Sequence, residues 1–258
     1  MKNRVRSAEI VTGLSDFDAL AGPLPRGRVT VVAARSSSGT TAFALGVARH
    51  NDEIGHRVAF ASFESGTDTI MGNLVAAVTS VNIDRPLSID KGRRARIERA
   101  REAMERSRLL MWSRALKTGK WPFENLMEQL AAHPQLALVV VDGYSQAAYG
   151  EPSEGATFAA LEQLALKRDI AVLVTAHLMP QEDTPETDPP ALSDVNPLET
   201  PVKEAQTAMI LHRPDRHGTV PQRRGEVDLI AVHGWQDTGN VTVRFEPEYH
   251  RFVDLPNQ

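Results

Sequence analysis

The sequence contains no cysteine among its 258 residues, which excludes disulfide bridges and thiolate metal sites. No apolar run reaches the length that crosses a membrane, and the basic N-terminus is not followed by the apolar stretch of a secretion signal. The net charge of −4 gives no overall attraction toward nucleic acid, so such binding needs a local basic patch. These absences predict a cytoplasmic protein with no membrane partner.

Short apolar segments alternate with helical ones along most of the chain, which is the pattern of a parallel sheet built from βαβ units. Strands are expected at 29–34, 57–63, 109–112, 136–141, 170–177, 208–211, 227–232 and 241–245. Helices are expected at 41–53, 67–80, 88–107, 123–132 and 156–167. Thr67 is the expected N-cap of its helix, and residues 237–240 the expected turn of a closing hairpin. The predicted fold class is α/β, a mainly parallel sheet flanked by helices with a C-terminal antiparallel hairpin.

We expect residues 1–10 to form an N-terminal extension and residues 11–258 to form one domain, because no linker-like change of composition divides the chain. Within that domain, residues 178–202 are rich in proline and carry six acidic side chains but no lysine or arginine. This composition predicts a long acidic loop.

A turn of small residues follows the first strand and opens the first helix of the βαβ series. Its residues are Arg35, Ser36, Ser37, Ser38, Gly39, Thr40 and Thr41. Such a turn points backbone N–H groups and a helix N-terminus at an anion. In an ATPase loop a lysine follows the last glycine and contacts the β- and γ-phosphates. Thr40 holds that position here, and no lysine occurs between Lys2 and Lys91.

Several motifs along the chain form an ordered set. Residues 33–44 read Ala-Ala-Arg-Ser-Ser-Ser-Gly-Thr-Thr-Ala-Phe-Ala, and residues 62–65 read Ser-Phe-Glu-Ser. An apolar strand ends in Asp142, and further motifs lie at 193–208 and 243–252. The order and spacing of these motifs resemble those of the C-terminal motor domain of DnaB-type replicative helicases, which belong to the RecA-fold ATPases. The resemblance extends from about residue 10 to the end of the sequence. That family has Ala-Ala-Arg-Pro-Ser-Met-Gly-Lys-Thr-Thr-Phe-Ala and Ser-Leu-Glu-Met at the first two motifs.

The resemblance implies a RecA-like P-loop NTPase fold that binds ATP or ADP with Mg²⁺, weakly, and needs neither ligand to fold. The implied nucleotide contacts are Arg35, Ser36, Ser37, Ser38, Gly39, Thr40, Thr41 and His177. Thr41 and Asp142 are the implied magnesium contacts, and Glu64 is the implied water-activating carboxylate if the protein is an active enzyme.

Departures from the family pattern fall on the phosphate-sensing positions. The loop lysine is Thr40, and the glutamine that the helicases carry at the end of a sheet strand is His177. The Lys-x-Arg pair that reaches the neighbouring subunit's nucleotide is replaced around residues 233–235. Each lost charge-assisted contact is worth about 1.5–3 kcal/mol. Hydrolysis is therefore expected to be absent or very weak.

A basic segment is the candidate nucleic-acid surface. Its members are Lys91, Arg93, Arg94, Arg96, Arg99 and Arg101, followed by Arg106 and Arg108. At helical spacing these cations form a face that tracks phosphates. The alternative is a solvated helix with internal ion pairs such as Glu98–Arg101 and Glu98–Arg94.

Three functions stay open. The first is a non-hydrolysing accessory, regulatory or assembly protein, linked to DNA replication or other DNA transactions, that docks on itself or on another RecA-fold or helicase protein. The second is an active ATP-dependent DNA helicase or translocase with an unorthodox loop and a lysine or arginine brought from elsewhere. The third is a nucleic-acid-binding module that acts without nucleotide through the basic helix.

Overall fold

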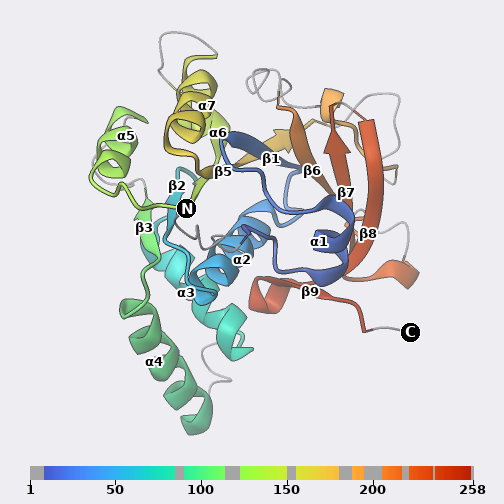
Figure 1. Cartoon of the computed structure of the whole chain (residues 1–258). Coiled ribbons are helices and arrows are strands. Elements are labelled where there is room, and N and C mark those ends of the chain that lie inside the picture. The colour runs from blue at the N-terminus through green and yellow to red at the C-terminus, as the bar shows by residue number, and fades with distance from the viewer. Residues whose placement is uncertain are drawn as a thin grey trace, which may run out of the picture.

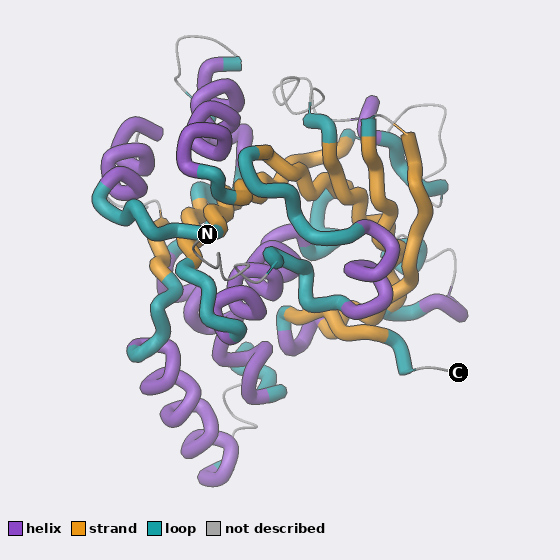
Figure 2. The backbone as a smooth tube through the Cα atoms, in the orientation of Figure 1, coloured by secondary structure: helices purple, strands orange, loops and turns teal. Residues whose placement is uncertain are grey.

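One twisted sheet runs through the molecule, as the strands of Figures 1 and 2 show. The computed structural model describes residues 9–84, 90–113, 123–149, 155–179, 188–194, 205–216, 221–234 and 236–256. Within them, the strand order is β3-β2-β4-β5-β1-β6-β7-β8-β9. The parallel strands are β1 (Arg28–Arg35), β2 (Val58–Ser62), β3 (Leu110–Ser113), β4 (Leu138–Asp142), β5 (Ala171–Leu178) and β6 (Thr207–His212). Antiparallel strands β7 (Glu226–His233), β8 (Gln236–Glu246) and β9 (Arg251–Asp254) complete the sheet.

The central strands are buried on both faces, as parallel strands covered by helices are. Along β1, Val31 and Ala33 join one apolar cluster while Val32 and Ala34 join the other, because successive side chains of a strand point to opposite faces. The first cluster includes residues of α5 (Phe123–Ala131), α6 (Tyr144–Ala147) and α7 (Ala156–Arg168). The second includes residues of α1 (Ser15–Ala21), α2 (Thr40–Glu53) and α3 (Thr67–Thr79). The predicted α/β fold, a mainly parallel sheet flanked by helices with antiparallel strands at its C-terminal end, is confirmed.

Helix α4 (Lys91–Glu105) extends from the body at the lower end of Figure 1. Asp90 caps it by accepting a hydrogen bond from the backbone N–H of Arg93 at 2.8 Å. The helix packs against α3 through Ile97 and Ala100, which form a small apolar cluster with Val75. The other positions of its first turns are exposed. None of the described helices is both long and apolar enough to cross a membrane.

The predicted closing turn at residues 237–240 is wrong, because these residues lie inside β8. His233 pairs with Gln236, so the chain reverses earlier, between these two residues. The register shifts opposite Ala231, whose carbonyl accepts a hydrogen bond from the Thr238 hydroxyl at 3.0 Å. Gly239 follows with φ of +136°. The turn-like composition therefore marks a β-bulge, in which Thr238 is the extra residue and Gly239 lies beside it. Glycine is common at bulges as well as in turns.

The N-cap prediction for Thr67 is also wrong. Gly66 precedes the first helical residue in an extended conformation, and no side chain caps the helix. Thr67 is the first residue of α3, and its hydroxyl lies 2.6 Å from that of Ser113. Helices α1 and α6 were not predicted, and β9, which pairs antiparallel with β8, is absent from the expected strands although the motif at 243–252 covers part of it. Most of the expected extension at 1–10, and residues 180–187 and 195–202 of the expected acidic loop, lie outside the described residues.

Candidate functional site: a phosphate loop at the carboxyl edge of the sheet

The loop after β1 has the backbone of an anion cradle. The backbone N–H of Ser38 donates to the carbonyl of Arg35 at 3.2 Å. Ser37 has φ of +62° and Gly39 has φ of +99°, so two left-handed residues bend the chain into α2. Gly39 is the N-cap of α2, and no side chain caps this helix. The first N–H groups of α2 therefore face the loop, where they suit a phosphate.

Aromatic rings pack directly behind this loop. A Cβ at position 39 would lie 3.1 Å from the Cζ atoms of both Phe245 and Phe252. These two rings stack at 4.6 Å, and Phe43 of α2 meets Phe252 edge-on at 5.6 Å. The end of β8 and the start of β9 thus support the loop, so Gly39 is needed for space as well as for backbone conformation.

Asp142 is the buried polar centre of the site, at the end of β4. Its carboxylate accepts hydrogen bonds from the hydroxyls of Ser62 at 2.8 Å, Thr41 at 3.0 Å and Thr175 at 3.1 Å. Burial raises the pKa of Asp142, and the three hydroxyls and the charge of His177 oppose that rise. The adjacent ends of β2, β4 and β5 bring these groups together, since Ser62 is the register partner of Asp142.

Glu64 and His177 meet at the outer rim of the same edge. The Oε1 of Glu64 lies 3.6 Å from the Nε2 of His177, and both side chains are about one-quarter exposed. Gly143, with φ of +91°, lies so close to Glu64 that a Cβ at this position would be 2.6 Å from the Glu64 Cγ. The structure therefore brings together four of the predicted site residues: Thr41, Glu64, Asp142 and His177.

The other predicted loop residues have different surroundings. Ser36 and Ser37 are exposed, Ser38 is buried and Thr40 is half-buried in the first turn of α2. Arg35 is buried at the end of β1, and its Nη1 donates to the carbonyl of Asp188 at 3.1 Å. The sequence interpretation missed Ser62 and Thr175, which could have been found because they lie near the carboxyl ends of predicted strands. It also missed Arg213, whose Nη1 donates to the backbone carbonyl of Ser37 at 3.3 Å and which no motif had marked.

The residues present fit a nucleotide with a magnesium ion. The loop offers amides without a side-chain cap, and Thr41 and Asp142 offer two oxygen ligands close together. Mg²⁺ in nucleotide sites is held by one or two such groups together with the substrate's phosphates. No cluster of three or more His, Cys, Asp or Glu occurs among the residues that the structure describes.

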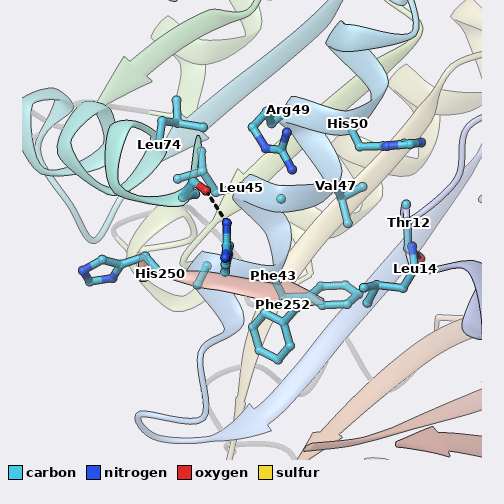
Figure 3. A pocket seen from close by; sticks show the side chains of 15 residues that line it. Thr12, Leu14, Phe43, Leu45, Val47, Arg49, His50, Leu74, His250 and Phe252 are labelled. Atoms are coloured by element: carbon cyan, nitrogen blue, oxygen red, sulfur yellow. Dashed lines mark hydrogen bonds between the residues drawn. The ribbon is translucent and has the colours of Figure 1, made fainter. Parts of the chain in front are cut away.

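A separate cavity lies beside α2 (Figure 3). Arg49, His50, Phe43 and Phe252 are among its lining residues. Its volume is about 50 Å³, whereas ligand pockets span about 300–1,000 Å³. This cavity is too small for a nucleotide.

The basic candidates form a surface of their own on α4. Lys91, Arg93, Arg94, Arg96, Arg99 and Arg101 are all exposed. The predicted Glu98–Arg101 pair is confirmed at 3.6 Å, and Arg106–Glu102 is a second pair at 3.5 Å. Exposed pairs of this kind contribute about 0–1 kcal/mol to stability. The glutamates of α4 reduce its net positive charge without removing it.

The sheet order, the loop and the row of polar strand ends define a P-loop protein of the RecA type. The family model described as DnaB-like helicase C-terminal domain matches residues 9–254. The chain therefore belongs to that family.

Two relatives and three solved structures agree with this assignment. The chain is 28% identical over 261 residues to the replicative DNA helicase DnaB of Leifsonia xyli subsp. xyli (strain CTCB07), and 22% identical to the replicative DNA helicase DnaC of Bacillus subtilis (strain 168). Each match covers 95% of this chain and 56% of the relative, so the chain spans about half of their length.

The solved structures show the fold. One is a chain described as an ATPase domain, with a TM-score of 0.80 and 20% identity; the match covers 96% of this chain and 92% of that one. Another is a DnaB-like replicative helicase described with its interactions with primase, with a TM-score of 0.82 and 20% identity; the match covers 96% of this chain and 64% of that one. The RadB recombinase is a more distant case, with a TM-score of 0.61, 18% identity, 96% of this chain covered and 100% of that one.

Proposed function

We propose that this chain binds a nucleotide at residues 35–41 without turning it over at a useful rate. It then serves as an accessory, regulatory or assembly protein, linked to DNA replication or other DNA transactions. The observation that carries the proposal is the contrast within one site. The phosphate loop and the Thr41–Asp142 contact are intact, whereas Thr40 is neutral and Glu64 lies against His177.

The binding half of the proposal rests on groups that need no lysine. Backbone amides of the loop and of α2 carry partial positive charge toward a phosphate. The hydroxyl of Thr41 and the carboxylate of Asp142 supply oxygen ligands to the accompanying magnesium ion. Without a lysine at position 40 the site loses about 1.5–3 kcal/mol of charge-assisted binding. The nucleotide is therefore held more weakly than in a loop with lysine, by about 10- to 150-fold.

The non-hydrolysing half rests on the rim of the site. A carboxylate that activates water must be free to accept a proton from that water. Glu64 lies 3.6 Å from His177 instead. The family's Lys-x-Arg pair is also replaced around residue 233, and an arginine acting from a neighbouring subunit is worth about 10³–10⁵ in rate where it has been tested.

The partner in this proposal is another RecA-type surface, either a second copy of this chain or another helicase-type protein. One structural neighbour is described together with its interactions with primase. The family membership of residues 9–254 supports a partner of the RecA type.

Calorimetric titration with ATP and a non-hydrolysable analogue, combined with a phosphate-release assay, tests the proposal. We expect binding of both ligands in the presence of Mg²⁺, and a rate of phosphate release that Glu64→Gln leaves unchanged. A mass measurement with and without nucleotide checks for assembly. Turnover at helicase-like rates that Glu64→Gln abolishes contradicts the proposal and supports the active helicase instead. Failure to bind either ligand at saturating Mg²⁺ removes nucleotide binding altogether.

The exposed face of α4 favours a second candidate function, nucleic-acid binding. Six cations on one projecting helix can track phosphates, with affinity that falls steeply as salt rises. Charge reversal at Arg94, Arg96 and Arg101 is expected to weaken single-stranded DNA binding and to reduce its salt dependence. A triple variant that binds DNA as the wild type does would exclude this surface.

A further inference from the structure

Arg213 reaches the phosphate loop from a distant part of the sequence. Its Nη1 donates to the backbone carbonyl of Ser37 at 3.3 Å. We infer that Arg213 supplies to a bound polyphosphate the positive charge that Thr40 does not carry. This inference rests on the proposed nucleotide binding and names the residue that makes such binding possible.

The topology of the sheet explains why Arg213 lies at the loop. Strands β1 and β6 are parallel neighbours, and Ala34 is the register partner of Leu211. Both strands end at the same edge, so the residues that follow them emerge side by side. The phosphate loop follows β1, and Arg213 follows β6 by one residue.

Three contacts hold the guanidinium in place. Its carbon atom lies 5.1 Å from the centre of the Phe245 ring, which also supports Gly39. Its Nε and Nη2 donate to the two carboxylate oxygens of Asp215 at 3.2 and 3.4 Å. Only 11% of the Arg213 side chain is exposed. A guanidinium that is fixed before the ligand arrives loses little conformational entropy on binding.

Asp215 orients Arg213 and is itself anchored. The backbone N–H of Gly225 donates to Asp215 Oδ2 at 2.8 Å. Burial alone raises the pKa of Asp215, but the hydrogen bonds from Gly225 and Arg213 outweigh it, and the net pKa is lowered. The carboxylate is therefore charged at neutral pH. It orients the guanidinium by accepting from Nε and Nη2, which leaves Nη1 on the side of the loop.

This arrangement differs from a lysine in the loop itself. A lysine would reach the phosphates from the first turn of α2 as a flexible point charge. Arg213 approaches from the end of the neighbouring strand β6 and is held by an aromatic ring and a carboxylate. The contribution of Arg213 should therefore depend on the number of phosphates in the ligand, because its charge acts on anionic oxygens.

The test is calorimetric titration of the full chain with inorganic pyrophosphate, ADP and adenosine in the presence of Mg²⁺. Arg213→Gln is compared with Arg224→Gln, which removes the same charge from an exposed residue nearby. We expect Arg213→Gln to weaken pyrophosphate and ADP by about 10- to 100-fold and to leave adenosine unchanged. Arg224→Gln should stay within about twofold of the wild type.

A double-mutant cycle with Thr40→Lys sharpens the test. If Arg213 replaces the missing lysine, the loss caused by Arg213→Gln should shrink to a few-fold once Thr40→Lys is present. Arg213→Lys keeps the charge but loses the two-pronged contact with Asp215, so it should retain more pyrophosphate affinity than Arg213→Gln and less than the wild type. Thermal unfolding of each variant checks the fold.

The outcomes separate the inference from the proposed function. A wild-type chain that binds neither ADP nor pyrophosphate overturns both. A wild-type chain that binds ADP, with Arg213→Gln equal to Arg224→Gln, overturns the role of Arg213 alone. An equal loss for adenosine and pyrophosphate, or an equal loss in the Thr40→Lys background, also overturns that role.

Discussion

The carboxylate of Glu64 lies 3.6 Å from the Nε2 of His177, across the ends of β2 and β5. Strand β4 lies between these two strands in the sheet, and it ends in Asp142. The three side chains therefore share one edge, with Asp142 buried below and the Glu64–His177 pair above. This places a basic side chain against the carboxylate that the family resemblance marks as water-activating.

Restoring both altered positions should produce hydrolysis. We expect the double variant Thr40→Lys/His177→Gln to release phosphate from ATP at a measurable rate, because it regains the phosphate-binding charge and frees Glu64. A phosphate-release assay measures the gain. Adding Glu64→Gln is the control and should return the rate to background. A double variant that stays at background would show that other missing groups limit the reaction.

Thr40→Lys alone should strengthen nucleotide binding. A new ammonium next to the phosphates contributes about 1.5–3 kcal/mol, which corresponds to about 10- to 150-fold in the dissociation constant of ADP. Calorimetric titration measures the change, and Thr40→Ala is the matched control, expected to bind as the wild type does. Equal affinities for all three proteins would mean that no phosphate lies near position 40.

Gly39→Ala should destabilise the fold more than Gly55→Ala does. Both glycines have φ of +99°, but a Cβ at position 55 meets nothing within 4 Å, whereas one at position 39 meets Phe245 and Phe252 at 3.1 Å. The shared backbone strain costs about 1–2 kcal/mol, and the crowding adds about 1–3 kcal/mol at position 39 alone. Urea denaturation of the two variants measures the difference. Equal losses would mean that the rings move away.

The Arg223–Asp228 pair should make stability depend on pH in the acid range. Burial raises the pKa of Asp228, but hydrogen bonds from Arg223 at 2.9 Å and Thr242 at 2.7 Å outweigh it, and the net pKa lies below 3.8. A lowered folded-state pKa means that the stabilisation is present above the unfolded value and is lost as pH falls through the folded one.

We therefore expect Asp228→Asn to cost about 1–3 kcal/mol at pH 7 and less as the pH approaches 3. Urea denaturation of both proteins between pH 3 and pH 7 measures this convergence. Asp68→Asn, at an exposed position of α3, is the control and should change stability by no more than about 0.5 kcal/mol. A constant difference between Asp228→Asn and the wild type across the range would contradict the shifted pKa.

Much of the fold could be predicted because its local signals agree. The central strands are runs of valine, alanine and leucine, and the helices between them carry apolar faces, so period and length identify them. The bulge in β8 could not be identified, because Asp237 to Asn240 have the composition of a tight turn. Whether such residues reverse the chain or lie in a bulged strand depends on the neighbouring strand.

The candidate site divides in the same way. The sequence alone determined the small-residue turn, the neutral Thr40 and the carboxylates Glu64 and Asp142 at strand ends, because these follow from residue type and position along the chain. Only the tertiary structure decided that His177 lies against Glu64, that Phe245 and Phe252 support Gly39, and that Arg213 contacts Ser37. These contacts join residues more than 100 positions apart, and strand order and register, which no local pattern encodes, bring them together.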